Sequence, residues 1–530
     1  MEFKKLSLNI KNLITKNLVI KGTLILTITG FATRILGFYN RIFLAGLIGA
    51  KELGIYQLIF PLYMVAFSIT TFGNELALTK LVSEYKSRQD MASAKAFFKA
   101  CFFITLIIGL IVSTIMYKNA DWLCMHILNA PECSSCVKVI CAGIPFMAMK
   151  GTIHGFFLGM EKSGVHGVSD FLEQIAKVFG LYLIATYICI RSQYDASFAV
   201  WGIVIGELVA FSYSVAALFY HNKKTHSKKN RRISYSSVNM NSSITAPPIR
   251  RQQILRIFFK NSIPLTTNRL ALTVLQSIEA IMIPTVLLSY YKNSTLSLAT
   301  YGVFSGMAFP FIMFPSTITN SLSTMLLPAV SSASSRLNTG YLKKLCEKSL
   351  HFCLLIGLFS TVVFYIFGPS IGNCLFESKE AGHYLFQLSL LCPFIYLATT
   401  LASILNGLGF ATHNLILTVI STIIRISLIL TAVPRIGITG YIIGLFIGYL
   451  FLTFACLHKL QKIVPVELQF AKSIFFPSVI FILLGAIAFW GYRKLLIFFQ
   501  GIPSVILLIA VIGIYGIISL LPLVVESARR

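Results

Sequence analysis

Charged side chains are scarce in this 530-residue sequence, and acidic ones are the scarcest. Charged residues make up 12% of the chain, with 18 acidic residues against 45 basic ones. A soluble protein of this length needs far more charge to cover its surface. Hydrophobic residues reach 56%, and apolar runs of about twenty residues or more are long enough to cross a bilayer. The sequence therefore predicts an all-α, polytopic integral membrane protein.

Signatures of several enzyme classes are also missing. The sequence contains neither the nucleotide-binding pattern GxxxxGK[ST] nor the zinc-protease pattern HExxH. We therefore expect no enzyme activity, no ATP-driven transport by this chain alone, no metal and no cofactor beyond a coupling Na⁺ or H⁺. The net charge of +27 does not indicate a nucleic-acid partner, because the basic residues fall in short segments between apolar helices.

The eleven cysteines lie mostly inside apolar stretches, where they act as small hydrophobic residues. Cys133 and Cys136 form a CxxC pattern near Cys124, in a segment predicted to lie outside the cell. The sequence leaves open whether these two form a disulfide.

The apolar runs predict about fourteen transmembrane helices, because a chain in lipid must satisfy its backbone amides within its own segment. The predicted helices are residues 19–46, 54–79, 96–116, 137–159, 171–190, 198–220, 254–288, 300–328, 349–368, 384–407, 414–433, 438–458, 473–491 and 502–524. With the N-terminus inside, thirty of the 45 Lys and Arg residues fall in inside segments and nine in outside segments. This bias predicts a multi-pass membrane protein with both termini in the cytoplasm.

A polar stretch divides the first twelve helices into six and six. Residues 221–253 are basic and rich in Ser and Asn, which predicts a cytoplasmic linker too polar to fold alone. The predicted parts are an N-lobe (1–220), this linker, a C-lobe (254–460) and an appendage of helices 13 and 14 (461–530).

The two lobes show weak internal similarity. Pro145, Phe146, Gly159 and Lys177 recur as Pro393, Phe394, Gly407 and Arg425, each 248 residues later. Lys21 likewise meets Lys260 at a shift of 239. The matched helices have the same predicted orientation, which indicates a parallel repeat with substrate bound near mid-membrane.

Charges inside the predicted helices are the candidates for function, because each costs about 2.5–3.5 kcal/mol at a helix centre. They are Arg34, Arg41, Glu75, Lys150, Lys177, Glu207, Arg269, Glu279 and Arg425, with Glu173 near a helix end. Arg34 and Arg41 share a helix face, as do Lys150 and His154. Glu173 and Lys177 have the spacing of a simple ion pair. The excess of basic over acidic residues favours a cavity that accepts an anion.

The start of the chain resembles a known family. The elements that carry the resemblance are Lys21-Gly22-Thr23, Thr33-Arg34-Ile35-Leu36-Gly37-Phe38, Arg41-Ile42-Phe43-Leu44, Ile48-Gly49-Ala50 and Leu53-Gly54-Ile55-Tyr56-Gln57-Leu58-Ile59-Phe60-Pro61. They resemble the polysaccharide exporters related to stage V sporulation protein B and the MurJ lipid II flippases. Both groups belong to the multidrug/oligosaccharidyl-lipid/polysaccharide (MOP) superfamily, which also contains the MATE exporters. The helix count and the two extra helices fit this superfamily over nearly the whole chain.

The resemblance implies a protein of the bacterial cell membrane that exports an undecaprenyl-pyrophosphate-linked glycan, such as the peptidoglycan precursor lipid II, with sporulation as one setting. It implies a pyrophosphate site at Arg34, and we expect Arg41, Lys150, His154, Lys177 and Arg425 to line the same cavity. The sequence departs from the MurJ pattern in the second helix, where Asn74 and Glu75 stand instead of an arginine, and in the eighth helix, which lacks a basic residue.

Two other functions stay open. A cation-coupled multidrug exporter of the same superfamily would use Glu75 and Glu279 to bind the coupling ion. A scaffold for a cell-wall synthesis complex would have cell-wall synthases as partners, but a scaffold has no need of buried charges.

Overall fold

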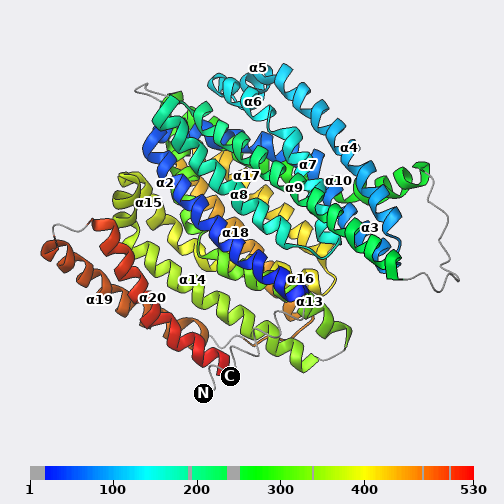
Figure 1. The fold of residues 1–530 in the computed structure, drawn as a ribbon. Helices are drawn as coiled ribbons and strands as arrows, with labels where there is room; N and C mark the ends of the chain where they lie inside the picture. The colour runs from blue at the N-terminus through cyan, green and yellow to red at the C-terminus, as the bar shows by residue number, and fades with distance from the viewer. Residues whose placement is uncertain are drawn as a thin grey trace. The chain divides into compact units, whose positions relative to one another are not determined.

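The structure is a computed structural model that describes residues 18–188, 194–235, 251–336, 339–467, 471–499 and 503–529. Helices form all the regular secondary structure of these residues, and no strand occurs among them (Figure 1). The all-α prediction is therefore confirmed. The chain divides into two compact units, which are described separately below.

Within the described residues, ten helices or continuous runs of helix are long and apolar enough to cross a membrane. The number rises to eleven when the bent pair Pro131–Cys141 and Ile144–Gly159 is taken as one span. The first two predicted helices form one run in which helix α2 (Leu18–Phe67) has a non-helical residue, Gly49, with φ of 77°. Multi-pass membrane insertion is thus supported, whereas the count of fourteen stays a prediction.

Unit 1 contains residues 1–40 and 58–278. Its helices after α2 are η1 (Ser68–Phe72), α3 (Gly73–Ser87), α4 (Met91–Lys118), α5 (Ala120–Trp122), η2 (Leu123–Ile127), η3 (Pro131–Cys133), α6 (Ser134–Cys141), α7 (Ile144–Gly159), α8 (Gly164–Leu183), η4 (Ile184–Ile188), α9 (Ala196–Tyr235) and the first part of α10 (Arg251–Tyr291). Helix α7 packs against α3, α4 and α9, and α8 packs against α9. Leu81, Phe97, Phe156 and Phe258 belong to one buried core of this unit.

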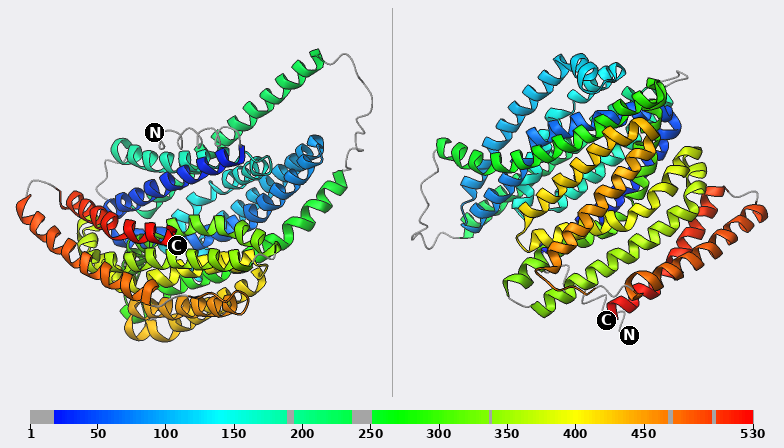
Figure 2. Two further views of the ribbon diagram at one scale, coloured as in Figure 1. Left: turned by 90° about the horizontal axis from the view of Figure 1, so that it is seen from below. Right: turned by 180° about the vertical axis from the view of Figure 1, so that it is seen from behind.

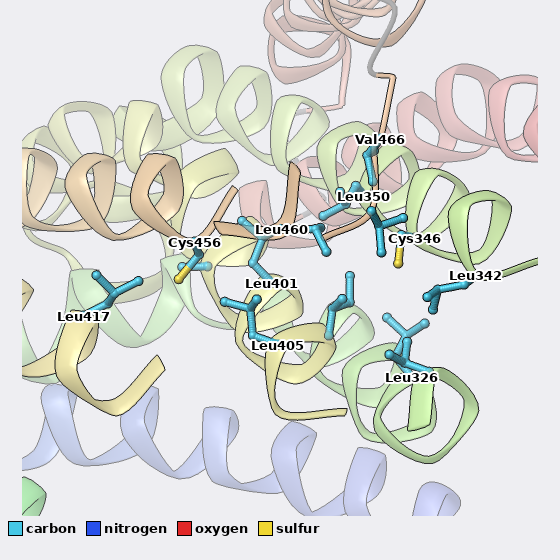
Figure 3. Packing of buried hydrophobic residues seen from close by; sticks show 14 of the residues in the cluster. Leu326, Leu342, Cys346, Leu350, Leu401, Leu405, Leu417, Cys456, Leu460 and Val466 are labelled. Carbon is cyan, nitrogen blue, oxygen red and sulfur yellow. The ribbon is translucent and has the colours of Figure 1, made fainter. Parts of the chain in front are cut away.

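Unit 2 contains residues 41–57 and 279–530. Its further helices are α11 (Ser294–Gly302), η5 (Val303–Ala308), α12 (Phe309–Ile312), α13 (Ser316–Ser335), α14 (Thr339–Phe376), α15 (Lys379–Leu388), η6 (Ser389–Leu391), α16 (Cys392–Gly407), α17 (Ala411–Ile436), α18 (Ile438–Gln461), η7 (Ala471–Phe475), α19 (Phe476–Phe498) and α20 (Ser504–Arg529). The long helix α14 packs against α13, α15, α16, α19 and α20, and Figure 2 shows α19 and α20 along the border of this unit. Leu401 and Leu405 of α16 meet Leu350 and Leu460 in the core drawn in Figure 3.

The two units repeat the same packing details. Helices α7 and α16 have equal length and begin 248 residues apart, each with Pro at its start. In unit 1 the Thr105 hydroxyl lies 2.7 Å from that of Thr152, and in unit 2 the Cys353 thiol lies 3.0 Å from the Thr400 hydroxyl. These residues also differ by 248 in number. Side-chain contacts within each unit thus follow the same shift of 248 residues as the sequence matches from which we inferred a duplication.

The segment between the lobes differs from expectation. Helix α9 continues through Tyr235 and α10 begins at Arg251, so residues 221–235 are helical rather than unstructured. Residues 236–250 lie outside the described residues. The boundary between the compact units falls between Ile278 and Glu279, inside α10, and not in the predicted linker.

No disulfide joins any two cysteines of the described residues, Cys133 and Cys136 included. The structure therefore contains no disulfide between these two.

Candidate functional site

A buried lysine joins three helices of unit 1. Lys150 of α7 places its Nζ 2.6 Å from Glu173 Oε2 on α8 and 2.8 Å from Glu207 Oε2 on α9. Tyr63 donates a hydrogen bond of 2.8 Å to the other oxygen of Glu207. Only 11% of the Lys150 side chain and 5% of the Glu207 side chain are exposed. Two carboxylates therefore compensate one ammonium that would otherwise be costly to bury.

This arrangement changes the role expected for Glu173. The sequence predicted that it pairs with Lys177 one helical turn away, but its carboxylate meets Lys150 of the neighbouring helix. The sequence marked Glu207 as an intramembrane charge but suggested no partner for it. Tyr63 was missed, because a tyrosine in an apolar helix carries no sequence signal of its own.

A second polar group of unit 1 surrounds His154, which is 2% exposed. Its Nδ1 lies 2.8 Å from Nδ1 of His166, and its Nε2 lies 3.3 Å from the Ser214 hydroxyl. Glu75 of α3 completes the group, since one ligand atom each from Glu75, His154 and His166 lie within 4.8 Å of one another. His166 was not singled out from the sequence.

Glycines on α7 allow this approach. A Cβ atom on Gly155 would lie 2.7 Å from the backbone oxygen of Glu75, and one on Gly151 would lie 2.1 Å from the Thr71 side chain. Any larger residue at these two positions, one helical turn apart, would push α7 away from η1 and α3. The glycines therefore bring Glu75 beside His154.

A buried ion pair lies within unit 2. Arg425 of α17 binds Glu279 of α10 through two hydrogen bonds, from Nε to Oε1 at 2.7 Å and from Nη2 to Oε2 at 2.8 Å. Ser421 and Thr422 accept further hydrogen bonds from the guanidinium, which also lies over the Tyr449 ring at 5.2 Å. Tyr441 donates to Glu279 at 3.3 Å.

This pairing joins two residues for which the sequence suggested different roles. Arg425 was expected in the substrate cavity and Glu279 at the coupling-ion site, yet each is the other's partner. Both are less than a tenth exposed. A planar, bidentate pair of this kind fixes the two helices firmly.

Arg34 and Arg41 of α2 differ from the other predicted cations. Neither makes an ion pair or a hydrogen bond to another side chain among the described residues, and the Arg34 side chain is exposed. Lys177 of α8 is partly buried. The structure thus separates two arginines that hold no carboxylate from Lys150 and Arg425, which do.

Asn74, one of the two polar residues that stand where the MurJ pattern has an arginine, forms hydrogen bonds within unit 1. Asn74 donates from its amide to the Thr70 backbone oxygen at 2.9 Å and accepts a hydrogen bond from Ser262 at 2.5 Å. It links α3 to α10, and Glu75 beside it joins the histidine group.

The sequence contains the pattern GxSxG, which is typical of serine hydrolases, at residues 368–372. These residues lie inside helix α14. The nucleophile of serine hydrolases stands instead on a sharp strand-to-helix turn, and no strand occurs in the described part of the chain. The pattern therefore does not form a nucleophile elbow.

Comparison with known proteins finds relatives that cover most of the chain. The chain is 26% identical to stage V sporulation protein B of Bacillus subtilis (strain 168) over 86% of each chain. It is 21% identical to the lipid II flippase MurJ of the same organism, over 82% of this chain and 80% of that protein. The relatives are known as flippases and sporulation proteins rather than enzymes.

Solved structures with the same fold are transporters. An inward-facing MATE family transporter of the MOP superfamily matches 82% of this chain and 96% of its own with a TM-score of 0.64 at 14% identity. An outward-facing one matches 84% and 95% with a TM-score of 0.58 at 16% identity. Residues 19–334 match the family described as "Polysaccharide biosynthesis protein". With a transporter fold, buried charge networks and more than half its length inside that match, the chain belongs to this polysaccharide biosynthesis protein family.

Proposed function

We propose that the chain is a flippase that exports an undecaprenyl-pyrophosphate-linked glycan across the cell membrane by alternating access, with lipid II as its substrate. Its place among the membrane exporters of the MOP superfamily supports the mode of action. The relative named lipid II flippase supports the substrate. The repeated packing of the two units suits a carrier that works by changing their relative position.

The observation that carries the proposal is the distribution of free and paired cations. A pyrophosphate group arriving at Lys150 or Arg425 would have to displace bound carboxylates. Arg34 and Arg41 hold no carboxylate among the described residues. A guanidinium offers a planar pair of donors that matches phosphate oxygens. We therefore assign Arg34 as the main pyrophosphate ligand and Arg41 as the second.

The cation-coupled alternative keeps one of its two candidate residues. Glu279 would have to release Arg425 before it could bind a coupling Na⁺ or H⁺. Glu75 lies beside two histidines and has no arginine or lysine bound to it in the described structure. Coupling through Glu75 is therefore compatible with the flippase proposal, and it would serve to reset the empty carrier.

Complementation tests the proposal. We expect this chain to restore growth to a bacterium depleted of its resident lipid II flippase, and Arg34→Ala to abolish the rescue while the protein still accumulates in the membrane. Arg34→Lys should rescue in part, because lysine offers no bidentate fork. Arg88→Ala is the matched control, since Arg88 forms an exposed ion pair with Glu84 that contributes little.

Each outcome has a clear meaning. Full rescue by Arg34→Ala would remove Arg34 from the site. Failure of the unchanged chain to rescue would remove lipid II as its substrate. Failure to rescue together with co-purification of cell-wall synthases would favour the scaffold function.

A further inference from the structure

The histidine group of unit 1 has the composition of a metal site. We propose that Glu75 of α3, His154 of α7 and His166 of α8 bind a divalent transition-metal ion of the zinc class. This site uses neither of the arginines assigned to the pyrophosphate, and it does not depend on which lipid the protein carries.

The distances suit such an ion after a small adjustment. Zinc binds histidine nitrogen and carboxylate oxygen at about 2.0–2.2 Å in tetrahedral geometry, which sets ligand atoms roughly 3.3–3.6 Å apart. The three ligand atoms here lie within 4.8 Å of one another, and the two Nδ1 atoms are 2.8 Å apart. To admit the ion at ordinary bond lengths, the two Nδ1 atoms need to separate by about 0.5 Å and the Glu75 oxygen needs to approach them by at most about 1.5 Å.

The hydrogen bonds around His154 prepare one ring nitrogen for a ligand. Ser214 donates to the Ala210 backbone oxygen at 2.8 Å, so its own oxygen is left to accept from Nε2 of His154 at 3.3 Å. With its proton on Nε2, the ring turns the lone pair of Nδ1 toward His166. Metal-binding histidines are commonly held by an outer partner in this way. The two Nδ1 atoms face each other at 2.8 Å, a distance that a single hydrogen bridges, and a metal ion fits between them once the rings separate.

Charge around the group also favours a dication. Asp170 Oδ1 lies 3.7 Å from Nδ1 of His166 and provides a possible fourth ligand. Asp170 and Lys150 are the charged neighbours of Glu75, and Lys150 is itself bound to Glu173 and Glu207. This part of unit 1 therefore holds one ammonium group and four carboxylates, which are those of Glu75, Asp170, Glu173 and Glu207.

The donor types select the class of ion. Imidazole nitrogen suits Zn²⁺, Ni²⁺ and Cu²⁺, whereas Mg²⁺ and Ca²⁺ prefer shells of oxygen alone. Two nitrogens in a set of three therefore argue against a magnesium or calcium site. The ion also has a route of entry, since 29% of the His166 side chain and 41% of the Asp170 side chain are exposed.

A bound ion would tie three helices together at the turn between α7 and α8. The test uses the full-length protein purified in detergent, with its affinity tag removed and metals stripped by a chelator. We expect titration with Zn²⁺ to show one ion per chain and a rise in Tm. Co²⁺ should give the visible absorption of a tetrahedral site. His154→Gln and His166→Gln should each weaken Zn²⁺ binding by more than about tenfold, because losing even an outer partner of a ligand costs about 10–100-fold.

Two further variants separate coordination from a structural role. His383→Gln removes an exposed histidine of unit 2 and should leave Zn²⁺ binding unchanged. His166→Cys replaces one zinc ligand by another, so it should retain Zn²⁺ and give the Co²⁺ complex a new thiolate charge-transfer band. The proposal would be overturned by absence of Zn²⁺ binding to the unchanged protein, by His154→Gln and His166→Gln binding Zn²⁺ as tightly as the unchanged protein, or by equal competition from Mg²⁺.

Discussion

Arg425 and Glu279 show at the level of single residues how this protein buries charge. Their side chains satisfy each other through two short hydrogen bonds, and Ser421, Thr422 and Tyr441 take most of the remaining donor and acceptor positions. A buried pair with this geometry is close to neutral in its net contribution, but either member left alone is a large cost.

We therefore expect Arg425→Met to destabilise unit 2 by about 3–5 kcal/mol, because Glu279 would stay buried without its partner. The double substitution Arg425→Met with Glu279→Leu should recover most of that loss. Thermal unfolding of the detergent-solubilised proteins measures both effects. If the double variant is as unstable as the single one, the pair stabilises unit 2 by more than the neutralisation of each charge by the other.

At this scale the sequence predicts which residues matter better than it predicts their contacts. The low charge content made Lys150, Glu207, Glu279 and Arg425 stand out, because a charge in an apolar helix is costly. Their partners could not be assigned, since Lys150 and Glu207 lie on different helices and Arg425 is 146 residues from Glu279. His166 carried no signal, because it stands at the start of a helix, next to a turn, where histidine is unremarkable.

At the scale of helices, the apolar runs place most elements well because the bilayer sets their length. Predicted helix 438–458 is observed as Ile438–Gln461, and 414–433 as Ala411–Ile436. The run 300–328 is broken instead, with α12 ending at Ile312 and α13 beginning at Ser316. Hydropathy does not report such breaks, nor the continuation of α9 into the basic residues after His221.

Close helix packing gives a prediction for α14. A Cβ on Gly357 would lie 2.6 Å from the Cα of Pro393 in α16, where no side chain can move aside. Gly357→Ala should therefore lower the stability of the protein by about 1–3 kcal/mol, as overpacking does. Gly491→Ala in α19 is the matched control, because its new methyl group meets nothing within 4 Å. Equal unfolding temperatures for the two variants would show that α14 and α16 separate easily.

The short helix α5 gives a prediction for pH. The Ser134 hydroxyl and the Lys138 ammonium donate hydrogen bonds to the Asp121 carboxylate and hold its pKa below the ordinary value of 3.8. A carboxyl whose pKa is lowered by folding stabilises the folded state above its unfolded pKa, and that contribution disappears as the pH falls through the folded pKa.

The unchanged protein should accordingly be more stable than Asp121→Asn at pH 7, and the two should converge as the pH falls below 3.8. Hydrogen exchange in the segment from α5 to α6, measured at pH 7 and again at a pH below 3.8, tests this prediction locally. A difference that persists in acid would assign the effect to the shape of the side chain rather than to its charge.

For the whole molecule, the proposed substrate makes transport sensitive to voltage. With the cell interior negative, outward movement of one negative charge is favoured by about 2.3 kcal/mol per 100 mV. We expect lipid II transport in vesicles to rise with an imposed potential and to fall when the potential is collapsed. Glu75→Gln tests whether a bound cation resets the carrier. Transport that ignores the potential but stops without Na⁺ or a proton gradient would contradict a potential-driven step.

The sequence also predicts a duplication of the molecule, because the matching prolines and glycines keep one register. It does not reveal how the chain is shared between the compact units. Residues 41–57 precede most of unit 1 in sequence yet belong to unit 2, and residues up to 278 follow the linker yet belong to unit 1. A change from apolar to polar residues along the sequence marks where the chain leaves the membrane. It carries no information about the unit in which a helix packs.

This sharing of segments has a consequence for biosynthesis. The unit 1 core includes Ile254 and Phe258 of α10. The ribosome makes these two residues after all the other helices of unit 1. The first half of the chain therefore waits in the membrane with an unfilled core until α10 arrives. Unit 2 in turn needs residues 41–57, which are made long before its other helices. Two fragments cut between α9 and α10 should accumulate only when a cell makes both, since each holds a piece that completes the other.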